Sequence, residues 1–188
     1  MLPRRSFLRS FLGCFAASAL LLLLPGITMS AADAPILTGP VTVVELEGKT
    51  LTAPHPVPRV VLSDAEWKKK LDPEVFKVLR AAGTERPFCG GLLHNKGEGY
   101  YVCAGCGLPL FKSVDKFDSG TGWPSFSQEV YPGNVRRITD SSYGMTRVEI
   151  RCARCDGHLG HVFDDGPAPT NTRHCLNSAA LTFVSTAP

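Results

Sequence analysis

Residues 103–106 read Cys-Ala-Gly-Cys and residues 152–155 read Cys-Ala-Arg-Cys, and these two tetrapeptides decide the fold. Each is a C-x-x-C pair that follows a β-like run and lies at a predicted turn. Two such pairs can surround one Zn²⁺ ion with four thiolates at about 2.3 Å. The predicted metal ligands are Cys103, Cys106, Cys152 and Cys155.

Metal binding is not the only chemistry open to these cysteines. Two disulfides or a redox-active dithiol would use the same residues. The match between the two tetrapeptides favours a metal, and four thiolates leave no open coordination position. We therefore predict one structural zinc ion, which staples two distant parts of a larger sheet and contributes directly to the folding free energy.

The chain around these pairs is rich in turns and short β-like runs. It has 188 residues, including 18 glycines and 15 prolines, and this length suits one domain plus a leader. From Thr84 onward the pattern predicts a mostly antiparallel β domain. The expected strands lie within residues 100–102, 108–111, 145–150 and 176–184.

Two short helices are predicted to precede this β domain. Ser63 and Glu66 form a capping box that starts the first helix, which is expected to run to about Leu71. Pro73 takes the first position of the second helix, and Gly83 is expected to end it. These helices carry no obvious chemistry, so we expect them to cover the core.

The first 34 residues are predicted to be an export signal. Arg4 and Arg5 precede an apolar run at residues 11–24, and small residues at 32–34 fit a cleavage site. The paired arginines resemble a twin-arginine signal, which exports proteins already folded, and an ordinary secretory signal is the alternative. The predicted location is the periplasm. The apolar run is too short for a confident membrane span.

Residues 35–60 are predicted to be an N-terminal extension that is poorly ordered, apart from a short strand at 41–44. Residues 61–188 then form the single functional domain. The formal net charge of the chain is +3 and no basic stripe is visible. The composition therefore gives no support for nucleic-acid binding.

The hexapeptide at residues 173–178, Arg-His-Cys-Leu-Asn-Ser, is polar for a segment that leads into a β-like run. Alternate residues of a strand share a face, so Arg173, Cys175 and Asn177 are expected to point the same way. A neighbouring cation lowers the pKa of a thiol, and the thiolate is the reactive form. The alternative is a small buried cysteine beside a surface arginine.

Two further segments carry residues suited to binding or catalysis. Trp123 lies in a glycine-flanked loop, where it is either a core residue or a platform for a ligand. His158 and His161 lie three apart, shortly after the second cysteine pair. Because four thiolates already complete a metal shell, we expect these histidines to handle protons or hydrogen bonds.

Taken together, these motifs resemble the methionine sulfoxide reductase B family. The resemblance covers residues 67–183 and implies a mainly β (α+β) fold, with two antiparallel β-sheets and short N-terminal helices stapled by zinc. It also implies an enzyme that reduces the R epimer of methionine sulfoxide to methionine within oxidised proteins. Besides the cysteine pairs, it rests on residues 83–88, 122–126, 158–166 and 173–179.

The resemblance implies a role for each candidate residue. Cys175 is the expected nucleophile, with Arg173 beside its thiolate. Trp123 is expected to contact the methyl group of the substrate. The residues expected to line the pocket and hold the sulfoxide oxygen, or a water near it, are His158, His161 and Asn177.

The chemistry of the reaction fits these residue types. A sulfoxide sulfur is a poor electrophile until its oxygen is protonated, and a histidine can supply that proton. Attack by Cys175 and oxygen transfer leave a sulfenic acid, which a second thiol converts to a disulfide that a dithiol reductant opens. Many family members carry this resolving cysteine where the present chain has Thr121. We predict that Cys89 resolves Cys175, with a static disulfide between them or an inert Cys89 as the alternatives.

The recycling partner implied by the family is a thioredoxin-like reductant, and an exported enzyme needs an exported one. We expect the protein to be a monomer. A non-enzymatic zinc-ribbon binding module is the alternative function, and the near-neutral charge, the leader and the polar face around Cys175 argue against it. A general thiol–disulfide oxidoreductase is disfavoured because both C-x-x-C pairs are assigned to metal.

Overall fold

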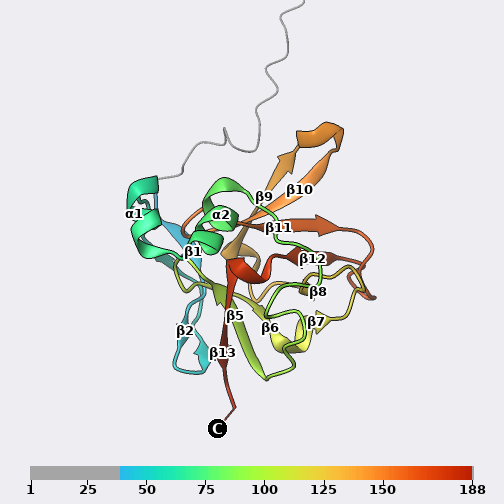
Figure 1. Cartoon of the computed structure of the whole chain (residues 1–188). Helices are drawn as coiled ribbons and strands as arrows, with labels where there is room; N and C mark the ends of the chain where they lie inside the picture. The colour runs from blue at the N-terminus through green and yellow to red at the C-terminus, as the bar shows by residue number, and fades with distance from the viewer. Residues whose placement is uncertain (1–38, 188) are drawn as a thin grey trace, which may run out of the picture.

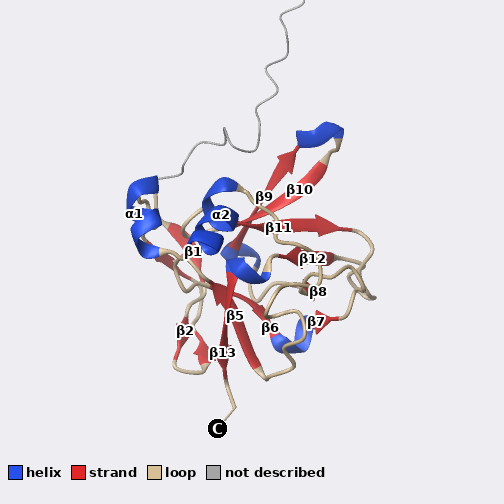
Figure 2. Ribbon diagram, in the orientation of Figure 1, coloured by secondary structure: helices blue, strands red, loops and turns tan. Residues whose placement is uncertain are grey.

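The computed structural model describes residues 39–187, so the predicted export signal at residues 1–34 lies outside the described residues. Two antiparallel sheets dominate the fold, and helix is limited to short segments (Figure 1 and Figure 2). The larger sheet contains, in spatial order, β7 (Lys116–Phe117), β8 (Ser125–Phe126), β12 (Arg173–Leu176), β11 (His158–Phe163), β10 (Arg147–Cys152) and β9 (Val135–Asp140). The smaller sheet contains β13 (Leu181–Ser185), β5 (Gly99–Cys103) and β6 (Pro109–Lys112). The predicted fold class is confirmed.

A cluster of aromatic side chains joins the two sheets. Tyr101 of β5, Phe111 of β6 and Phe126 of β8 are each 0% exposed. The ring centroid of Phe126 lies 4.8 Å from that of Tyr101 and 4.7 Å from that of Phe111, which is the spacing of favourable aromatic pairs. Burial of large apolar side chains is a main source of folding stability, so this cluster fixes one sheet against the other.

The two predicted helices are present and begin at the predicted residues, but the second one ends one residue before the expected Gly83, at the capping residue Ala82. In α1 (Asp64–Lys70), the Ser63 hydroxyl and the Glu66 carboxylate each accept a hydrogen bond from the other residue's backbone N–H. In α2 (Pro73–Ala81), proline opens the first turn, and the capping residue Ala82 adopts a left-handed conformation with φ 49°.

The helices cover the two C-x-x-C turns. Trp67 of α1 and Leu79 of α2 are almost fully buried, at 1% and 2% exposure. Leu79 lies against Gly105 and Gly157, where an added Cβ would come within 3.3 Å and 3.0 Å of its side chain. Small residues at these two positions let the helix approach both turns closely.

The segment before the helices is ordered and forms part of the core. Val43 is 0% exposed. The buried side chain of Asn134 accepts a hydrogen bond from the Val44 N–H at 2.9 Å and donates one to the Val44 carbonyl oxygen at 2.8 Å. The predicted strand near residues 41–44 is therefore confirmed, whereas the expectation of poor order is wrong for residues 39–60. The two pairs of short antiparallel strands here are β1 (Val41–Val43) with β4 (His55–Val57), and β2 (Leu46–Glu47) with β3 (Thr50–Leu51).

The single strand predicted at residues 176–184 is wrong, because the chain changes sheets there. β12 ends at Leu176, the 3₁₀ turn η5 (Ser178–Ala180) follows, and β13 then begins in the smaller sheet. The Glu85 carboxylate accepts hydrogen bonds from the N–H groups of Ser178 at 2.6 Å and Ala179 at 3.1 Å. These bonds satisfy the first two N–H groups of the turn. In a continuous strand, the same groups would need partners on a neighbouring strand.

Within residues 39–187, no helix combines the length and the apolar character needed to cross a bilayer.

Candidate active site and metal centre

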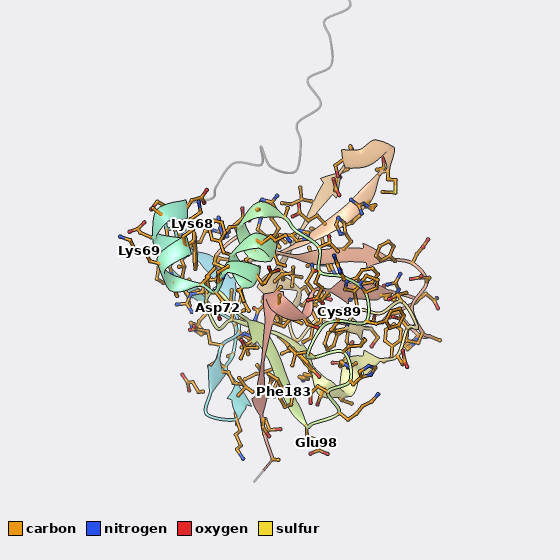
Figure 3. All side chains as sticks on the ribbon, in the orientation of Figure 1. Lys68, Lys69, Asp72, Cys89, Glu98 and Phe183 are labelled. Carbon is orange, nitrogen blue, oxygen red and sulfur yellow. The ribbon has the colours of Figure 1, made fainter. Side chains whose placement is uncertain are left out.

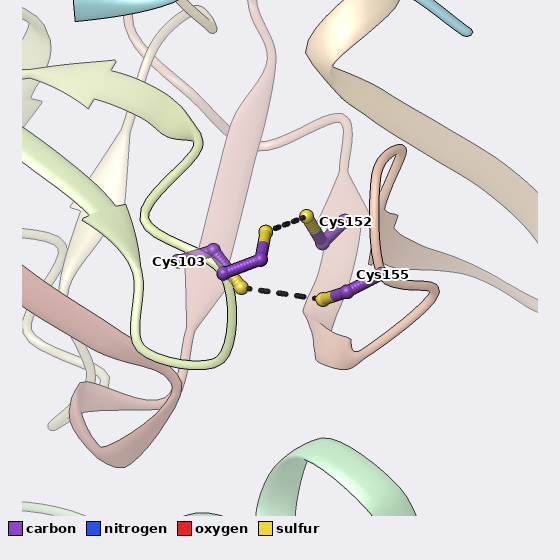
Figure 4. A group of neighbouring side chains, drawn as sticks. Cys103, Cys152 and Cys155 are labelled. Carbon is purple, nitrogen blue, oxygen red and sulfur yellow. Dashed lines mark hydrogen bonds between the residues drawn. The ribbon is translucent and has the colours of Figure 1, made fainter. Parts of the chain in front are cut away.

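The four predicted metal ligands come together between the two sheets. Their sulfur atoms all lie within 4.8 Å of one another, with 3.6 Å between Cys103 and Cys155 and 3.5 Å between Cys106 and Cys152. Figure 4 shows the side chains of the turn after β5 facing Cys152 and Cys155 from the turn after β10. A tetrahedral zinc site with Zn–S bonds of about 2.3 Å has sulfur atoms about 3.8 Å apart, so this cluster can hold one metal ion and its chemistry fits zinc.

The two cysteine turns have the same backbone geometry. In each, the residue after the second cysteine donates its N–H to the carbonyl oxygen of the first cysteine, Gly107 to Cys103 at 2.8 Å and Asp156 to Cys152 at 2.9 Å. Gly107 and Asp156 both adopt positive φ angles, 77° and 58°. The short internal match in the sequence thus corresponds to two equivalent knuckles that present thiols from opposite sides.

The catalytic candidates gather on one face of the larger sheet, around its central strand β12. Cys175 pairs with His161 of β11 on one side and with Ser125 of β8 on the other. His161 in turn pairs with Glu149 of β10. Since cross-strand partners share a face, the register alone aligns a carboxylate, an imidazole and a thiol in one row.

A pocket of about 130 Å³ opens over this row. Three predicted site residues besides Cys175 line it: Trp123, His161 and Asn177. Its other lining residues are Thr84, Arg147, Phe163 and Leu176. The predicted residues His158, Arg173 and Cys89 lie outside this lining, and each has a different environment.

Burial, rather than Arg173, dominates the electrostatics of Cys175. Burial raises the pKa of the Cys175 thiol, and the charge of Arg173 and hydrogen bonds from Thr121 and Arg173 offset that effect only in part. The prediction that Arg173 lowers this pKa below its ordinary value is therefore wrong for the free protein. The predicted proximity of the two side chains is correct.

Arg173 is neutralised by a carboxylate that the sequence did not single out. Its Nε and Nη2 donate to the two carboxylate oxygens of Asp165 at 2.7 Å and 3.0 Å. Its guanidinium carbon lies 4.4 Å from the centre of the Phe163 ring. Burial is the main cause that keeps the Cys175 pKa raised, and the charge of Asp165 adds to it by opposing the influence of Arg173.

The two histidines face each other because β11 carries a bulge. Ile150 of β10 pairs with Gly160, but Arg151 pairs with His158, so Leu159 is the extra residue. A bulge lets residues three apart share a face, which a regular strand does not allow. The ring centroids of His158 and His161 consequently lie 5.5 Å apart in an edge-to-face arrangement.

A buried carboxylate supports His161. Its Nε2 lies 2.9 Å from Oδ2 of Asp140, which also accepts from Nη2 of Arg147 at 2.6 Å. Burial alone raises the pKa of Asp140, but hydrogen bonds from Ser142, His161 and Arg147 outweigh it and hold that pKa well below its ordinary value. Asp140 is therefore ionised and accepts the Nε2–H proton, so Nδ1 of His161 is the nitrogen left for the pocket.

A second buried carboxylate supports His158. Nδ1 of His158 lies 2.7 Å from Oε1 of Glu149, which also accepts from Nε of Arg151 at 2.8 Å. Burial raises the pKa of Glu149, but the hydrogen bonds from His158 and Arg151 lower it overall. Within the described part of the chain, His158 Nε2 and Glu149 Oε2 are buried without a hydrogen-bond partner. His158 therefore lies behind the pocket lining and keeps one polar atom unsatisfied.

Trp123 and Asn177 are both tied to the loop after α2. Nε1 of Trp123 donates to the Glu85 carbonyl oxygen at 3.2 Å. The Asn177 side-chain oxygen accepts from the Glu85 N–H at 3.0 Å, and its amide donates to the Leu159 carbonyl oxygen at 3.1 Å. The bond from Trp123 orients the indole, and the two bonds of Asn177 connect the loop to β11. Because its side-chain oxygen and amide both bond to the backbone, Asn177 acts mainly by holding the pocket wall in place.

Cys89 lies exposed on the same loop, at the surface (Figure 3). Its neighbour Phe88 is 64% exposed and adopts φ 64°, an unusual conformation for a bulky residue that marks local strain. The Phe88 N–H donates to the carbonyl oxygen of Gly122, beside Trp123, at 2.8 Å. Gly90 lies against the side chain of Ser178. The residues on both sides of Cys89 therefore contact segments that border the pocket.

Several site residues were not predicted from the sequence. Arg147 and Glu149 fall in the expected strand at 145–150, and their alternate spacing places them on one face. Nothing local shows that this face is the catalytic one, because that depends on the pairing of β10 with β11 and β9. The other residues missed are Thr84, Asp140, Phe163, Asp165 and Leu176.

Comparison with known proteins agrees with this geometry. The chain matches the SelR domain over residues 71–185. It is 57% identical over 121 residues to the peptide methionine sulfoxide reductase MsrB of Methanosarcina barkeri, covering 64% of this chain and 85% of that protein. The proteins of the same name from Synechococcus sp. and Leptospira interrogans are each 56% identical, over 66% and 64% of this chain and 91% and 92% of their own lengths. The chain therefore belongs to the peptide methionine sulfoxide reductase MsrB family.

Proposed function

We propose that this enzyme reduces peptidyl methionine (R)-S-oxide to methionine, with Cys175 as the nucleophile. One observation carries the proposal: a thiol, an indole ring and a carboxylate-supported imidazole border the same pocket of about 130 Å³. That volume has room for about four water molecules, which suits a single side chain. The names of the relatives support the same activity for the family.

Trp123 and Phe163 provide the apolar surfaces of the pocket. The hydrogen bond from Trp123 Nε1 to the Glu85 carbonyl oxygen holds the indole in one orientation. An apolar ring face suits the methyl group of the substrate, while the sulfoxide oxygen needs polar neighbours. The oxygen is therefore directed toward His161 and the methyl group toward Trp123, with the sulfur above Cys175.

The first step transfers oxygen from the substrate to the enzyme. The Cys175 sulfur attacks the sulfoxide sulfur while the thiol proton passes to the sulfoxide oxygen. The oxygen then moves to Cys175, the bond between the two sulfurs breaks, and methionine leaves. The substrate sulfur is reduced by two electrons and the Cys175 sulfur is oxidised by two, so the thiol becomes a sulfenic acid that retains the proton.

The ionisation of the pocket supports a proton route through His161. Burial raises the pKa of Cys175, so the free enzyme holds its thiol protonated. Burial lowers the pKa of His161, aided by the charge of Arg147 and only partly opposed by Asp140, so the imidazole is neutral. Its Nδ1 accepts the thiol proton and passes it to the sulfoxide oxygen, and Asp140 stabilises the imidazolium that forms in between.

His158 lies behind His161 and helps to hold the sulfoxide oxygen of the substrate, or a water near it. Its Nδ1 is committed to Glu149, and its buried Nε2 has no partner within the described residues. Buried polar atoms without partners are rare and are commonly explained by function. Asp140 and Glu149 are positioning residues in this scheme, because each fixes which nitrogen of its histidine is available.

The second step regenerates the thiol. The Cys89 thiol attacks the sulfenic acid of Cys175, forming a disulfide and releasing water. A thioredoxin-like dithiol then reduces this disulfide by exchange, and its own two thiols become a disulfide. The exposure of Cys89 and its strained neighbour Phe88 support a loop that can move toward Cys175.

The proposal also covers the bound metal, the cellular compartment, the oligomeric state and the reductant. We assign one structural zinc ion to the four-cysteine cluster, because its closed thiolate set leaves no position for substrate. The enzyme acts as a monomer in the periplasm on oxidised proteins, reaches that compartment by a twin-arginine signal in residues 1–34, and is recycled by an exported reductant.

The decisive experiment is a single-turnover assay with separated R and S epimers of a methionine sulfoxide peptide. Reduced enzyme without external reductant should form one methionine per chain from the R epimer and none from the S epimer. The Cys175→Ser variant should form none from either, while its circular dichroism spectrum and metal content match the parent. Normal turnover by this variant would overturn the assignment of the nucleophile.

The role of Cys89 needs its own test. The Cys89→Ser variant should complete the first turnover at the parental rate but lose steady-state activity with thioredoxin. A small dithiol such as dithiothreitol reduces the sulfenic acid directly, so activity with that reductant should persist. Unchanged thioredoxin-dependent turnover would exclude Cys89 as the resolving thiol.

A further inference from the structure

Glu85 lies in the loop that follows α2 and carries Cys89, and its environment differs from that of its neighbours. Of residues 84–89, Glu85 alone is not exposed. Its backbone N–H, its backbone carbonyl and both of its carboxylate oxygens take part in hydrogen bonds to other segments. A partly buried residue with all of these groups engaged is fixed in position, even though the loop around it is exposed.

Three of these bonds join Glu85 to the segment directly after β12. The Asn177 side-chain oxygen accepts from the Glu85 N–H at 3.0 Å. The Glu85 carboxylate accepts from the N–H groups of Ser178 at 2.6 Å and Ala179 at 3.1 Å. This segment begins two positions after Cys175 in the chain. Glu85 is therefore held in a fixed relation to the proposed nucleophile.

The Glu85 carboxylate is covered where it meets the turn η5. A Cβ atom added to Gly90 would lie 2.7 Å from Oε1 of Glu85 and 2.1 Å from Oγ of Ser178. Glycine at this position therefore lets the chain after Cys89 pack closely over the carboxylate. Hydrogen bonds that are screened from water are stronger than exposed ones, and bonds to a charged group contribute more than bonds between neutral groups. Glu85 is consequently held firmly at the turn.

The fourth bond connects Glu85 to the pocket. Nε1 of Trp123 donates to the Glu85 carbonyl oxygen at 3.2 Å. An indole has a single hydrogen-bonding group, so this bond fixes the orientation of a ring that lines the pocket together with Cys175. We propose that Glu85 is a positioning residue, which holds the Trp123 ring in place relative to Cys175 and thereby sets the affinity for the sulfoxide side chain. This proposal rests on the proposed function.

The first test separates binding from chemistry, in steady-state assays with dithiothreitol and a methionine (R)-S-oxide peptide. In Glu85→Ala the carbonyl oxygen remains but its anchor is lost, so KM for the peptide should rise about tenfold. The value of kcat should fall by less than about threefold, because Cys175 and His161 keep their own contacts. Glu85→Gln retains one acceptor oxygen, so its KM should rise only about threefold. The matched control is Glu98→Ala, which removes the carboxylate of an exposed residue outside the pocket and should change neither constant.

A double-mutant cycle and a spectroscopic measurement distinguish positioning of the indole from a general structural role. Trp123→Phe keeps an aromatic ring but has no N–H to donate. In this background Glu85→Ala should change KM by less than about twofold, because the link is already broken. Trp67 and Trp123 are the two tryptophans of the chain, and Trp67 is only 1% exposed. An increase in the acrylamide quenching of tryptophan fluorescence in Glu85→Ala, which we expect, therefore reports on Trp123.

Two outcomes would overturn the proposal. The KM and the quenching of both Glu85 variants could match those of the parent protein, or the KM could rise equally in the Trp123→Phe background, which would make the role of Glu85 merely structural. If circular dichroism melts show that Glu85→Ala does not fold, Glu85→Gln carries both measurements. If the parent enzyme does not reduce the sulfoxide, the proposed function fails. The quenching comparison needs no substrate, so it still tests whether Glu85 holds the indole.

Discussion

The four-cysteine cluster and the candidate catalytic pocket place the same functional group, a cysteine thiol, in opposite surroundings. In the metal centre four sulfur atoms lie within 4.8 Å of one another under a cover of helix side chains. In the pocket Cys175 is the single cysteine of the lining, and it belongs to the cross-strand row of Glu149, His161 and Cys175. Two buried atoms beside that row, His158 Nε2 and Glu149 Oε2, have no partner within the described residues.

In the proposed scheme, surroundings rather than residue type divide the cysteines between structure and chemistry. A cluster whose ligands satisfy one another stabilises the fold and offers nothing to a substrate. A pocket that keeps polar side chains beside a single thiol has the capacity to bind a polar group. Three predictions test this contrast, starting with the largest effect.

The first prediction compares serine substitutions in the two regions. Cys152→Ser breaks the four-thiolate set, and we expect loss of the metal and of the cooperative thermal transition, since structural zinc contributes on the order of 10 kcal/mol. Cys175→Ser makes the same chemical change and should shift Tm by no more than a few degrees. Circular dichroism melts with metal analysis give the comparison. A folded, metal-free Cys152→Ser protein would show that the cluster is not structural.

The second prediction concerns the carboxylate behind His161. Asp140→Asn removes the charge that stabilises the imidazolium and allows the amide to donate to Nε2, which would place the proton on the wrong nitrogen. We expect kcat to fall about 10- to 100-fold, with a much smaller change in KM. The pKa of His161 should fall further, because Asp140 raises it in the parent enzyme.

Asp115→Asn is the matched control for this variant. Asp115 lies in a turn outside the pocket, where its carboxylate accepts a hydrogen bond from Gln128 at 2.7 Å. Removal of the Asp115 charge should leave kcat unchanged. Steady-state kinetics across pH, with chemical-shift titration of His161, separates positioning from a structural role. An Asp140→Asn enzyme with parental kcat and pH profile would remove Asp140 from the mechanism.

The third and smallest effect concerns the pKa of Cys175. Asp165 opposes Arg173 and raises this pKa, while Arg173 lowers it. Asp165→Asn should therefore lower the pKa and speed alkylation of Cys175 a few-fold at pH 8, whereas Arg173→Gln should raise the pKa and slow it. In both, the alkylation rate should rise with pH as the thiolate forms.

Iodoacetamide alkylation followed by mass spectrometry of the Cys175 peptide measures this effect, in a Cys89→Ser background that removes the exposed thiol. Equal and opposite shifts from the two variants would confirm that the salt bridge tunes the nucleophile. Identical profiles in all three proteins would show that burial alone sets the reactivity.

Much of the local structure was predictable from the sequence. The capping box at Ser63 and Glu66 and the proline that opens α2 are local signals, and both helices form there. The pairing of cysteines within each half of the four-cysteine cluster was predictable, because each C-x-x-C turn brings its own two thiols together. The strand β11 was missed, since His158 to Phe163 carry glycine and histidine rather than a clear alternating pattern.

The separation of β12 from β13 could not be predicted for a different reason. Residues 176–184 look like one β-like run, but Glu85, over ninety residues earlier, supplies the carboxylate that holds the turn at Ser178 and Ala179. No local pattern contains that information. The same holds for Asp140 and Glu149, which reach the histidines only through the register of β9, β10 and β11.

The sequence by itself indicated the four-cysteine cluster and the family, because these depend on residue types at short spacings. Only the tertiary structure decided that burial raises the pKa of the Cys175 thiol, and that each of the two histidines is held by a carboxylate. Those properties depend on burial and on cross-strand register, which arise only when distant segments pack against one another.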